Sequence, residues 1–441
     1  MLIEMAETAS AELNASFGEH TINQLVLMFR ENQINLNPGF QRRSVWTSLD
    51  RRRLIQSIVS GYPLPSVFLY RRNVDGRLIY DVIDGKQRLE TLFMFMGLGR
   101  FSRAKFEVKL DLGDGLLPYG WREIQKDFPD LRATFDSYKI QTVEVTGGLA
   151  QIIDLFIRIN STGKKLTAGE TRNARFYKSR FLKEADALVR RYQYYFTQSG
   201  ILSPMQIDRM KGTELIAELL MSINHGGPIN RKLALDRSIG NESVNGHTLA
   251  RLTRAFVRTM GLLKKMFPEL HVTRFRNIVE FYTLFLFVWE MDSERFVLSD
   301  KRRNAVAFEL LRKMSTGVDE LRLQLRNAVP AKATQRLYSD YLLTVQSQTD
   351  SGPQRERRRE MLRSLLSSVF DRKDEQRLFT SEQRRIIWNS DEKRNCRICG
   401  EPLTWNDVSI DHIIAHTKGG KTTLKNAQLS HRACNSRKGM G

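Results

Sequence analysis

The stretch of sequence that decides the fold of the carboxy-terminal region begins Cys396-Arg-Ile-Cys399 and ends His431-Arg-Ala-Cys434-Asn435-Ser-Arg437-Lys438-Gly439. All three cysteines of this 441-residue chain lie within it. Cys396 and Cys399 form a C-x-x-C pair, and His431 and Cys434 form a second pair at the same spacing. Two residues between ligands let a tight turn aim both side chains at one ion. Two such turns predict a tetrahedral structural Zn²⁺ site of Cys3His type.

The alternative to a zinc site is three unrelated buried thiols, because free cysteine packs as a small hydrophobic residue. Random placement would rarely bring every cysteine of a long chain to ligand spacing in one segment, which favours the metal. A closed four-ligand site also stabilises a fold that is too small to build its own core.

Between the two ligand pairs lie residues suited to hydrolysing a phosphodiester bond, which requires an activated water and a cation to offset charge on the phosphate. Asp411 and His412 are followed by two isoleucines and are predicted to end a strand. His412 suits the general base because the unperturbed pKa of histidine lies near neutrality. Asp411 and Asn435 offer hard oxygen ligands for Mg²⁺ or a similar ion. Asn426 can hydrogen-bond the backbone and hold the loop that carries His412.

These residues resemble the HNH (ββα-metal) endonucleases that carry a zinc-knuckle scaffold, over residues 381–441. The resemblance implies that His412 is the general base and that Asn426 is the second residue of the HNH name. Asn435 stands where a final histidine often falls, which makes an HNN variant, and Asp411 is similar to the metal-binding acid of the family. The implied catalytic ion is Mg²⁺ or Mn²⁺. His431 replaces the commoner cysteine of the zinc set.

Basic residues beside these positions are predicted to contact DNA: Lys418, Arg437 and Lys438. His416 is left open between contact with a metal or phosphate and simple solvation.

The charge balance of the whole chain also favours nucleic acid, because 70 Lys and Arg against 49 Asp and Glu leave a net charge of +21. Such a surplus attracts polyanions. Three cysteines assigned to metal leave none for disulfides and indicate a reducing compartment. Residues 1–17 carry no basic residue, unlike a secretory signal. The most apolar run, 278–291, is too short for a membrane span and is predicted to be a buried helix. We therefore expect a cytoplasmic protein with no membrane partner.

At the other end of the chain, residues 20–35 are predicted to form a helix, and strands at 67–70 and 78–83 a hairpin. The second strand runs into Asp84-Gly85-Lys86-Gln87-Arg88, followed by another predicted helix. A strand-to-helix turn with glycine places backbone N–H groups at a helix N-terminus, where phosphate binds readily, and Lys86 and Arg88 add positive charge. Taken alone, Asp-Gly is also simply a common turn.

Two further motifs accompany that turn, Gln41-Arg42-Arg43-x-x-Trp46 and Phe156-Ile157-Arg158-Ile159-Asn160-Ser161-Thr162-Gly163. Together the three motifs resemble the ParB/sulfiredoxin-like α/β domain of GmrS-type and SspE-type modification-dependent defence proteins. The resemblance covers residues 15–177. It implies sensing of modified DNA and binding of a nucleoside triphosphate, with hydrolysis left open because Lys86 replaces a glutamine of the motif.

The nucleotide candidates that this resemblance implies are Asp84, Gly85, Lys86, Gln87 and Arg88. Arg42, Arg158 and Asn160 are second-rank candidates, and Arg42 is also a candidate DNA contact. A helix C-cap with an ion pair is the alternative for Arg158 and Asn160.

At 441 residues, the chain exceeds the size at which one core stops growing, and the fold class predicted for it is multidomain α+β. The expected parts are a ParB/sulfiredoxin-like domain at 1–177, a helical domain at 178–346 and an HNH nuclease domain at 353–441 with its core at 381–441. The polar stretch Gln346–Pro353 is the expected linker. The arginines at 355, 357, 358 and 359 then begin a helix, either as a solvated face or along a DNA backbone.

The function expected is a metal-dependent DNA endonuclease of phage-defence or modification-dependent restriction type, gated by its amino-terminal domain. One alternative is a non-cleaving, zinc-containing DNA-binding regulator with a ParB-like domain. Another is chiefly a nucleotide hydrolase whose nuclease acts as a toxin. A homo-oligomer is compatible with each of these three functions.

Overall fold

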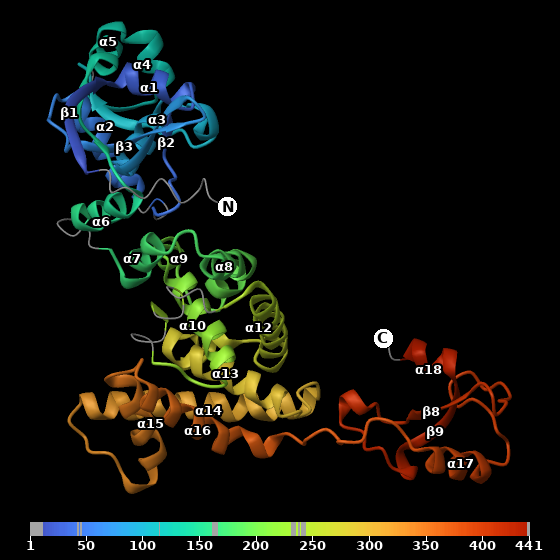
Figure 1. Cartoon of the computed structure of the whole chain (residues 1–441). Helices are drawn as coiled ribbons and strands as arrows, with labels where there is room; N and C mark the ends of the chain where they lie inside the picture. The colour runs from blue at the N-terminus through green and yellow to red at the C-terminus, as the bar shows by residue number, and fades with distance from the viewer. Residues whose placement is uncertain are drawn as a thin grey trace. The chain divides into compact units, whose positions relative to one another are not determined.

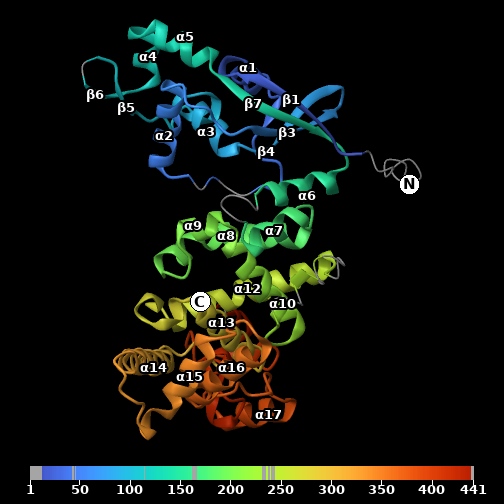
Figure 2. The same ribbon diagram turned by 90° about the vertical axis from the view of Figure 1, so that its left-hand side faces the viewer.

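A computed structural model describes residues 12–41, 44, 46–113, 115–160, 166–230, 235–236, 239 and 244–438. The chain divides into two compact units, coloured along the chain in Figure 1 and turned in Figure 2. Unit 1 comprises Met1–Arg191 with Ser203–Glu214, and unit 2 comprises Tyr192–Leu202 with Leu215–Gly441. The expected multidomain α+β class is confirmed. The domain boundaries predicted at 177, 346 and 353 stay predictions.

Unit 1 is built on a five-stranded sheet with strand order β1-β7-β3-β4-β2. β1 (Asn14–Thr21) pairs antiparallel with β7 (Lys139–Thr146), which runs parallel to β3 (Val67–Val74). β3 and β4 (Arg77–Asp84) are antiparallel, and the short β2 (Ile34–Asn35) is parallel to β4. Figure 2 labels β1, β7, β3 and β4 of this sheet. β4 ends at Asp84, where the predicted phosphate-binding turn begins.

The predicted hairpin is confirmed, since β3 and β4 are joined by Asp75 (φ 51°) and Gly76 (φ 78°). Two successive positive φ values match the tight turns that suit the twist of a hairpin. The helix predicted over 20–35 is wrong in length: α1 covers Ile22–Arg30. Asn32 has φ 58°, which a right-handed helix cannot contain, and the chain continues into β2.

Two clusters of buried apolar side chains form the core around this sheet, and the larger contains Leu25, Ile55, Val67, Leu92 and Phe93, all fully buried. The remaining elements as far as α10, of which α8 and α10 extend into unit 2, are α2 (Ser48–Val59), α3 (Lys86–Phe95), β5 (Val108–Asp111), β6 (Leu116–Tyr119), α4 (Trp121–Asp127), α5 (Pro129–Ser137), α6 (Leu149–Ile159), α7 (Ala168–Arg175), α8 (Arg180–Gln198), α9 (Pro204–Asp208) and α10 (Lys211–His225).

The larger part of unit 2 is helical and is centred on α13 (Ile278–Ser293), the most apolar run of the sequence. α13 contacts both α12 (Gly246–Met266) and α16 (Gly352–Leu366), as Figures 1 and 2 show. Its residues from 280 to 288 are all buried, so the prediction of a buried helix is confirmed. α14 (Lys301–Arg326) and α15 (Arg336–Gln346) complete the bundle. Among the described residues, no helix is long and apolar enough to cross a membrane.

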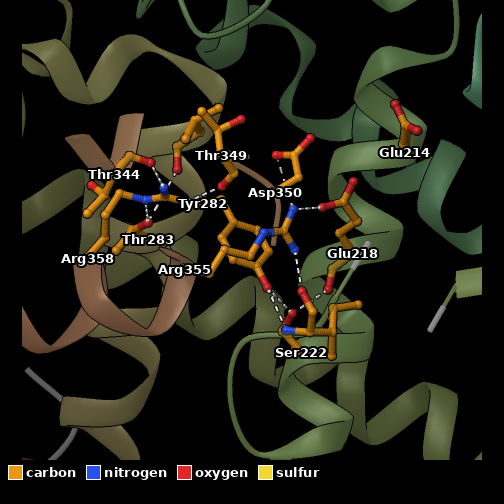
Figure 3. A network of polar contacts seen from close by, with 12 residues as sticks. Glu214, Glu218, Ser222, Tyr282, Thr283, Thr344, Thr349, Asp350, Arg355 and Arg358 are labelled. Carbon is orange, nitrogen blue, oxygen red and sulfur yellow. Dashed lines mark hydrogen bonds and ion pairs between the residues drawn. The ribbon is translucent and has the colours of Figure 1, made fainter. Parts of the chain in front are cut away.

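The arginine run at the start of α16 differs from its prediction, because Arg355 and Arg358 face inward (Figure 3). Arg358 is 0% exposed and donates to the carbonyl oxygens of Thr344 (2.5 Å) and Thr349 (2.6 Å). Arg355 pairs with Glu218 and donates to the carbonyl of Ile229 at 2.9 Å. The stretch 346–353, expected to be a linker, is thus fixed to the bundle. Residues three apart share one helix face, and here that face is buried.

Replacing Arg358 by methionine is expected to lower the free energy of unfolding of unit 2 by about 2–4 kcal/mol, because buried carbonyls lose their donors. The measurement is denaturant unfolding of the full chain. Arg357→Met is the matched control: this side chain is 52% exposed and lies 3.6 Å from Asp340, so its loss should cost about 0.5 kcal/mol or less. Equal effects of the two substitutions would contradict a structural role for Arg358.

The carboxy-terminal part of unit 2 is a small ββα arrangement preceded by α17 (Ser381–Ser390). β8 (Val408–His412) pairs antiparallel with β9 (Ala427–His431), and α18 (Arg432–Lys438) contacts both strands. The buried core consists of Leu403, Val408 and Leu429 with Cys396 and Cys434. So few apolar side chains cannot hold a fold unaided, which makes a metal at the cysteines physically reasonable.

Candidate functional site

The four predicted zinc ligands come together. The ligand atoms of Cys396, Cys399, His431 and Cys434 all lie within 4.8 Å of one another. His431 Nδ1 lies 3.3 Å from Cys399 Sγ and 3.9 Å from Cys434 Sγ. Ligands on a tetrahedral zinc ion with bonds of about 2.0–2.3 Å are separated by ~3.5–3.8 Å. The donor set and its spacing therefore fit a structural zinc ion.

Two further features of this cluster suit a metal. His431 Nε2 lies 3.2 Å from the carbonyl oxygen of Pro402, the kind of partner that orients a ligating imidazole. Burial opposes ionisation of Cys396, but the backbone N–H groups of Cys399, His431 and Ile398 outweigh it and lower the pKa of this thiol to about 6. The thiolate is the form that binds zinc.

His412 ends β8, and its ring lies among three neighbours. Its Nε2 is 3.0 Å from Thr422 Oγ1, and its ring centroid is 4.6 Å from that of Phe379 and 5.7 Å from that of His416. Burial, and after it the nearby His416, lowers the pKa of the His412 imidazole below its usual value. A neutral imidazole at pH 7 is the form that can accept a proton from water.

Asp411 is buried and already carries two donors. Gln428 Nε2 and Lys438 Nζ each lie 2.6 Å from Asp411 Oδ2. Lys438 Nζ also donates to the carbonyl oxygen of His412 at 2.9 Å. Both side-chain contacts fall on one oxygen, so a divalent cation at Asp411 has to use Oδ1 or displace the lysine ammonium.

The two candidate asparagines make different contacts. Asn426 Oδ1 accepts from the Ile414 N–H at 2.8 Å, and its Nδ2 donates to the carbonyls of Ile414 (3.0 Å) and Lys421 (2.9 Å). These bonds close the loop that follows His412. Asn435, on α18, donates from Nδ2 to Ser409 Oγ on β8 at 3.0 Å. Asp411 and Asn435 thus belong to elements that contact each other.

In unit 1, the expected strand-to-helix turn is present, with Gly85 in the left-handed region at φ 93°. A Cβ there would lie 2.7 Å from a Val67 methyl, so glycine is required. The side chains of the turn contact the protein itself. Arg88 bonds Asp84 at 2.6 Å, and the Gln87 amide oxygen accepts from Ser44 Oγ at 2.7 Å. Lys86 Nζ, buried, lies 3.9 Å from Glu90. Nucleotide binding here stays a prediction.

The second-rank candidates make the contacts of the structural alternative. Arg158 pairs with Asp154 at 2.8 Å, and Asn160 at the C-cap of α6 donates to the carbonyl of Phe156 at 2.9 Å. Arg42 and the segment from Ser161 to Gly163 lie outside the described residues.

Two regions of the chain match known protein families. Residues 22–177 match the GmrSD restriction endonuclease, N-terminal domain, and residues 396–441 match the HNH endonuclease. The chain joins a GmrSD-type N-terminal region to a C-terminal HNH region. Both resemblances expected from the motifs are confirmed, and together they support a nuclease of restriction type with DNA as its substrate. A search of the curated proteins finds no match.

Within the HNH region, the predicted DNA contacts fall into two groups. Lys418 and Arg437 are exposed, as a phosphate contact requires, whereas Lys438 is bound to Asp411. The Nε2 of His416, whose role was left open, lies 2.9 Å from the carbonyl oxygen of Asp374. One of the two ring nitrogens of His416 is therefore hydrogen-bonded within the protein.

Sequence reasoning missed three residues around His412. Phe379 and Asp374 precede the HNH region, and Thr422 is a buried threonine beside an exposed one. No ligand spacing or apolar period marks any of them, so only their contacts reveal them.

Proposed function

We propose that this protein is a metal-dependent DNA endonuclease of the phage-defence or modification-dependent restriction type. The observation that carries the proposal is the match of residues 396–441 to the HNH endonuclease, a region that holds both the Cys3His cluster and, on β8, Asp411 and His412. In this proposal the Cys3His cluster holds Zn²⁺ and fixes β9 and α18 against the knuckle at 396–399.

The chemistry is assigned to His412, Asp411 and Asn435. His412, neutral at pH 7, removes a proton from the water that attacks the phosphate. Asp411 and Asn435 supply oxygen donors of the kind that Mg²⁺ or Mn²⁺ prefers. When bound, that ion offsets charge on the phosphate. Asn426 keeps the loop after His412 closed, and Lys418 and Arg437 contact the DNA backbone.

The GmrSD-type region is proposed to gate cleavage by binding a nucleoside triphosphate or a modified base or backbone in phage DNA. Two observations support it: the match over residues 22–177 and the glycine turn at the N-terminus of α3, where backbone N–H groups can meet phosphate. Asp84, Gly85, Lys86, Gln87 and Arg88 are the residues assigned to this binding.

The test of gating is cleavage of unmodified, base-modified and sulfur-modified plasmid, each with and without a nucleoside triphosphate. Gly85→Ala is the variant to compare, because a Cβ clashes with Val67 and a left-handed residue becomes strained. We expect the modification- or nucleotide-dependent part of cleavage to fall at least tenfold, roughly the effect of misplacing a binding loop. Gly76→Ala is the control for backbone strain, because Gly76 is also left-handed at φ 78° but its Cβ would meet open space. Equal cleavage of every plasmid by wild type with and without nucleotide would contradict gating, and an undiminished dependence in Gly85→Ala would contradict the assignment to this turn.

A further inference from the structure

A segment that precedes the HNH region lies directly against the candidate base. This flanking segment, residues 374–379, places the Phe379 ring 4.6 Å from the ring of His412. The Asp374 carboxylate accepts from the Thr422 N–H at 2.7 Å, and its carbonyl oxygen lies 2.9 Å from His416 Nε2. The surroundings of His412 are therefore completed by residues outside the matched range 396–441.

The contact that matters most is the hydroxyl of Thr422, which is 4% exposed. It lies 3.0 Å from His412 Nε2 and also bonds the carbonyl oxygen of Gln376, in the flanking segment. A threonine hydroxyl has one proton to donate, and a carbonyl oxygen can only accept. The proton of Thr422 therefore points to Gln376, and the Thr422 oxygen faces His412 as an acceptor.

The opposite arrangement is physically poor. If Thr422 donated to His412, its oxygen lone pairs would face the carbonyl oxygen of Gln376 with no proton between the two atoms. Two acceptor oxygens that face each other without a proton repel, so the hydroxyl of the buried Thr422 is held in one orientation.

We propose that Thr422 is a positioning residue that fixes His412 with its proton on Nε2, which leaves the lone pair of Nδ1 to accept the proton of the attacking water. This inference rests on the proposed nuclease function. The water loses one proton to Nδ1, its oxygen forms the new P–O bond, and the bond to the leaving oxygen breaks with its electron pair. Solvent water protonates that leaving oxygen.

The bond between Nε2 and Thr422 is kept throughout this step. Both nitrogens of an imidazolium are donors, so Nε2–H continues to donate to the same oxygen after Nδ1 has gained its proton. Neither Thr422 nor the Gln376 carbonyl has to reorient. The Phe379 ring, packed on the imidazole, opposes the ring flip that would exchange the two nitrogens.

The first test compares plasmid nicking by Thr422→Val, which keeps the shape but loses the hydroxyl, with Thr422→Ser, which keeps the hydroxyl. We expect the valine variant to cut about 10- to 100-fold more slowly at saturating DNA, with unchanged KM, and the serine variant to stay within about threefold of wild type. Thr423→Val is the matched control, since Thr423 is exposed and its side chain makes no cap bond. Zinc content confirms that each variant is folded.

If wild type cuts DNA and Thr422→Val cuts it equally fast, the role of Thr422 is overturned, whereas the proposed function is not. A wild type that never cuts DNA would remove the proposed function instead. The second test covers both cases and any failure of the valine variant to fold. It reads the tautomer by NMR of ¹⁵N-histidine-labelled full-length protein at pH 8, with His412 assigned through its loss in His412→Gln. Protonated Nε2 is the expected result, and protonated Nδ1 would overturn the inference.

Discussion

Replacing His412 by alanine is expected to lower the rate of DNA nicking by about 10²- to 10⁴-fold, the usual contribution of a general base. His416, whose ring lies beside that of His412, is not expected to replace it as the base, because its Nε2 is bonded to the Asp374 carbonyl. DNA binding should persist, since the exposed basic residues Lys418 and Arg437 are unchanged. The measurement is conversion of supercoiled plasmid with Mg²⁺ or Mn²⁺, beside a gel-shift assay on the same DNA.

The matched control for that variant is His271→Ala, which removes an exposed histidine from the helical part of the same unit. It should cut at the wild-type rate. Undiminished nicking by His412→Ala would remove His412 as the base. Loss of both nicking and DNA binding would show instead that the substitution disrupted the fold.

Replacing Cys399 by serine is expected to release zinc and unfold the HNH region, while unit 1 stays folded. Cys399 is exposed, so its loss removes almost no apolar packing, and any large effect has to come from the metal. Structural zinc contributes an apparent ~10–16 kcal/mol in small zinc-bound folds, far more than the few buried apolar residues here can replace. Elemental analysis and hydrogen exchange of residues 396–438 are the two measurements.

Ile398→Ser is the control, because Ile398 lies between the two knuckle cysteines and is 42% exposed. This variant should retain one zinc ion per chain and normal protection of β8 and β9. A Cys399→Ser protein with unchanged zinc and protection would contradict the Cys3His assignment. Treatment of wild type with a strong chelator should reproduce the effect of the cysteine substitution.

Local patterns were sufficient to predict the Cys3His cluster and the hairpin. Ligand spacing in Cys396-x-x-Cys399 and His431-x-x-Cys434 is a property of a few adjacent residues, and so is the turn at Asp75-Gly76. The buried helix α13 could be predicted for a similar reason, since its whole length is apolar.

Features that depend on distant residues could not be predicted. In the sequence, Arg355 and Arg358 resemble residues of a solvated face. Their burial is evident only in the structure, where Arg355 pairs with Glu218 and Arg358 donates to the carbonyl of Thr344. The contact of Lys438 with Asp411 likewise appears only in the fold, and its predicted contact with DNA stays a prediction. The end of α1 depends on the positive φ of Asn32, which asparagine tolerates but does not require.

Nicking of supercoiled plasmid by the purified wild-type chain shows whether the HNH region cuts DNA, on which the proposed function depends. We expect nicked or linear product with Mg²⁺ or Mn²⁺ and intact plasmid with EDTA. Zinc-loaded protein that binds every DNA tested and cuts none of them, with either ion and with or without nucleotide, would contradict the proposed function. That result would favour a DNA-binding regulator.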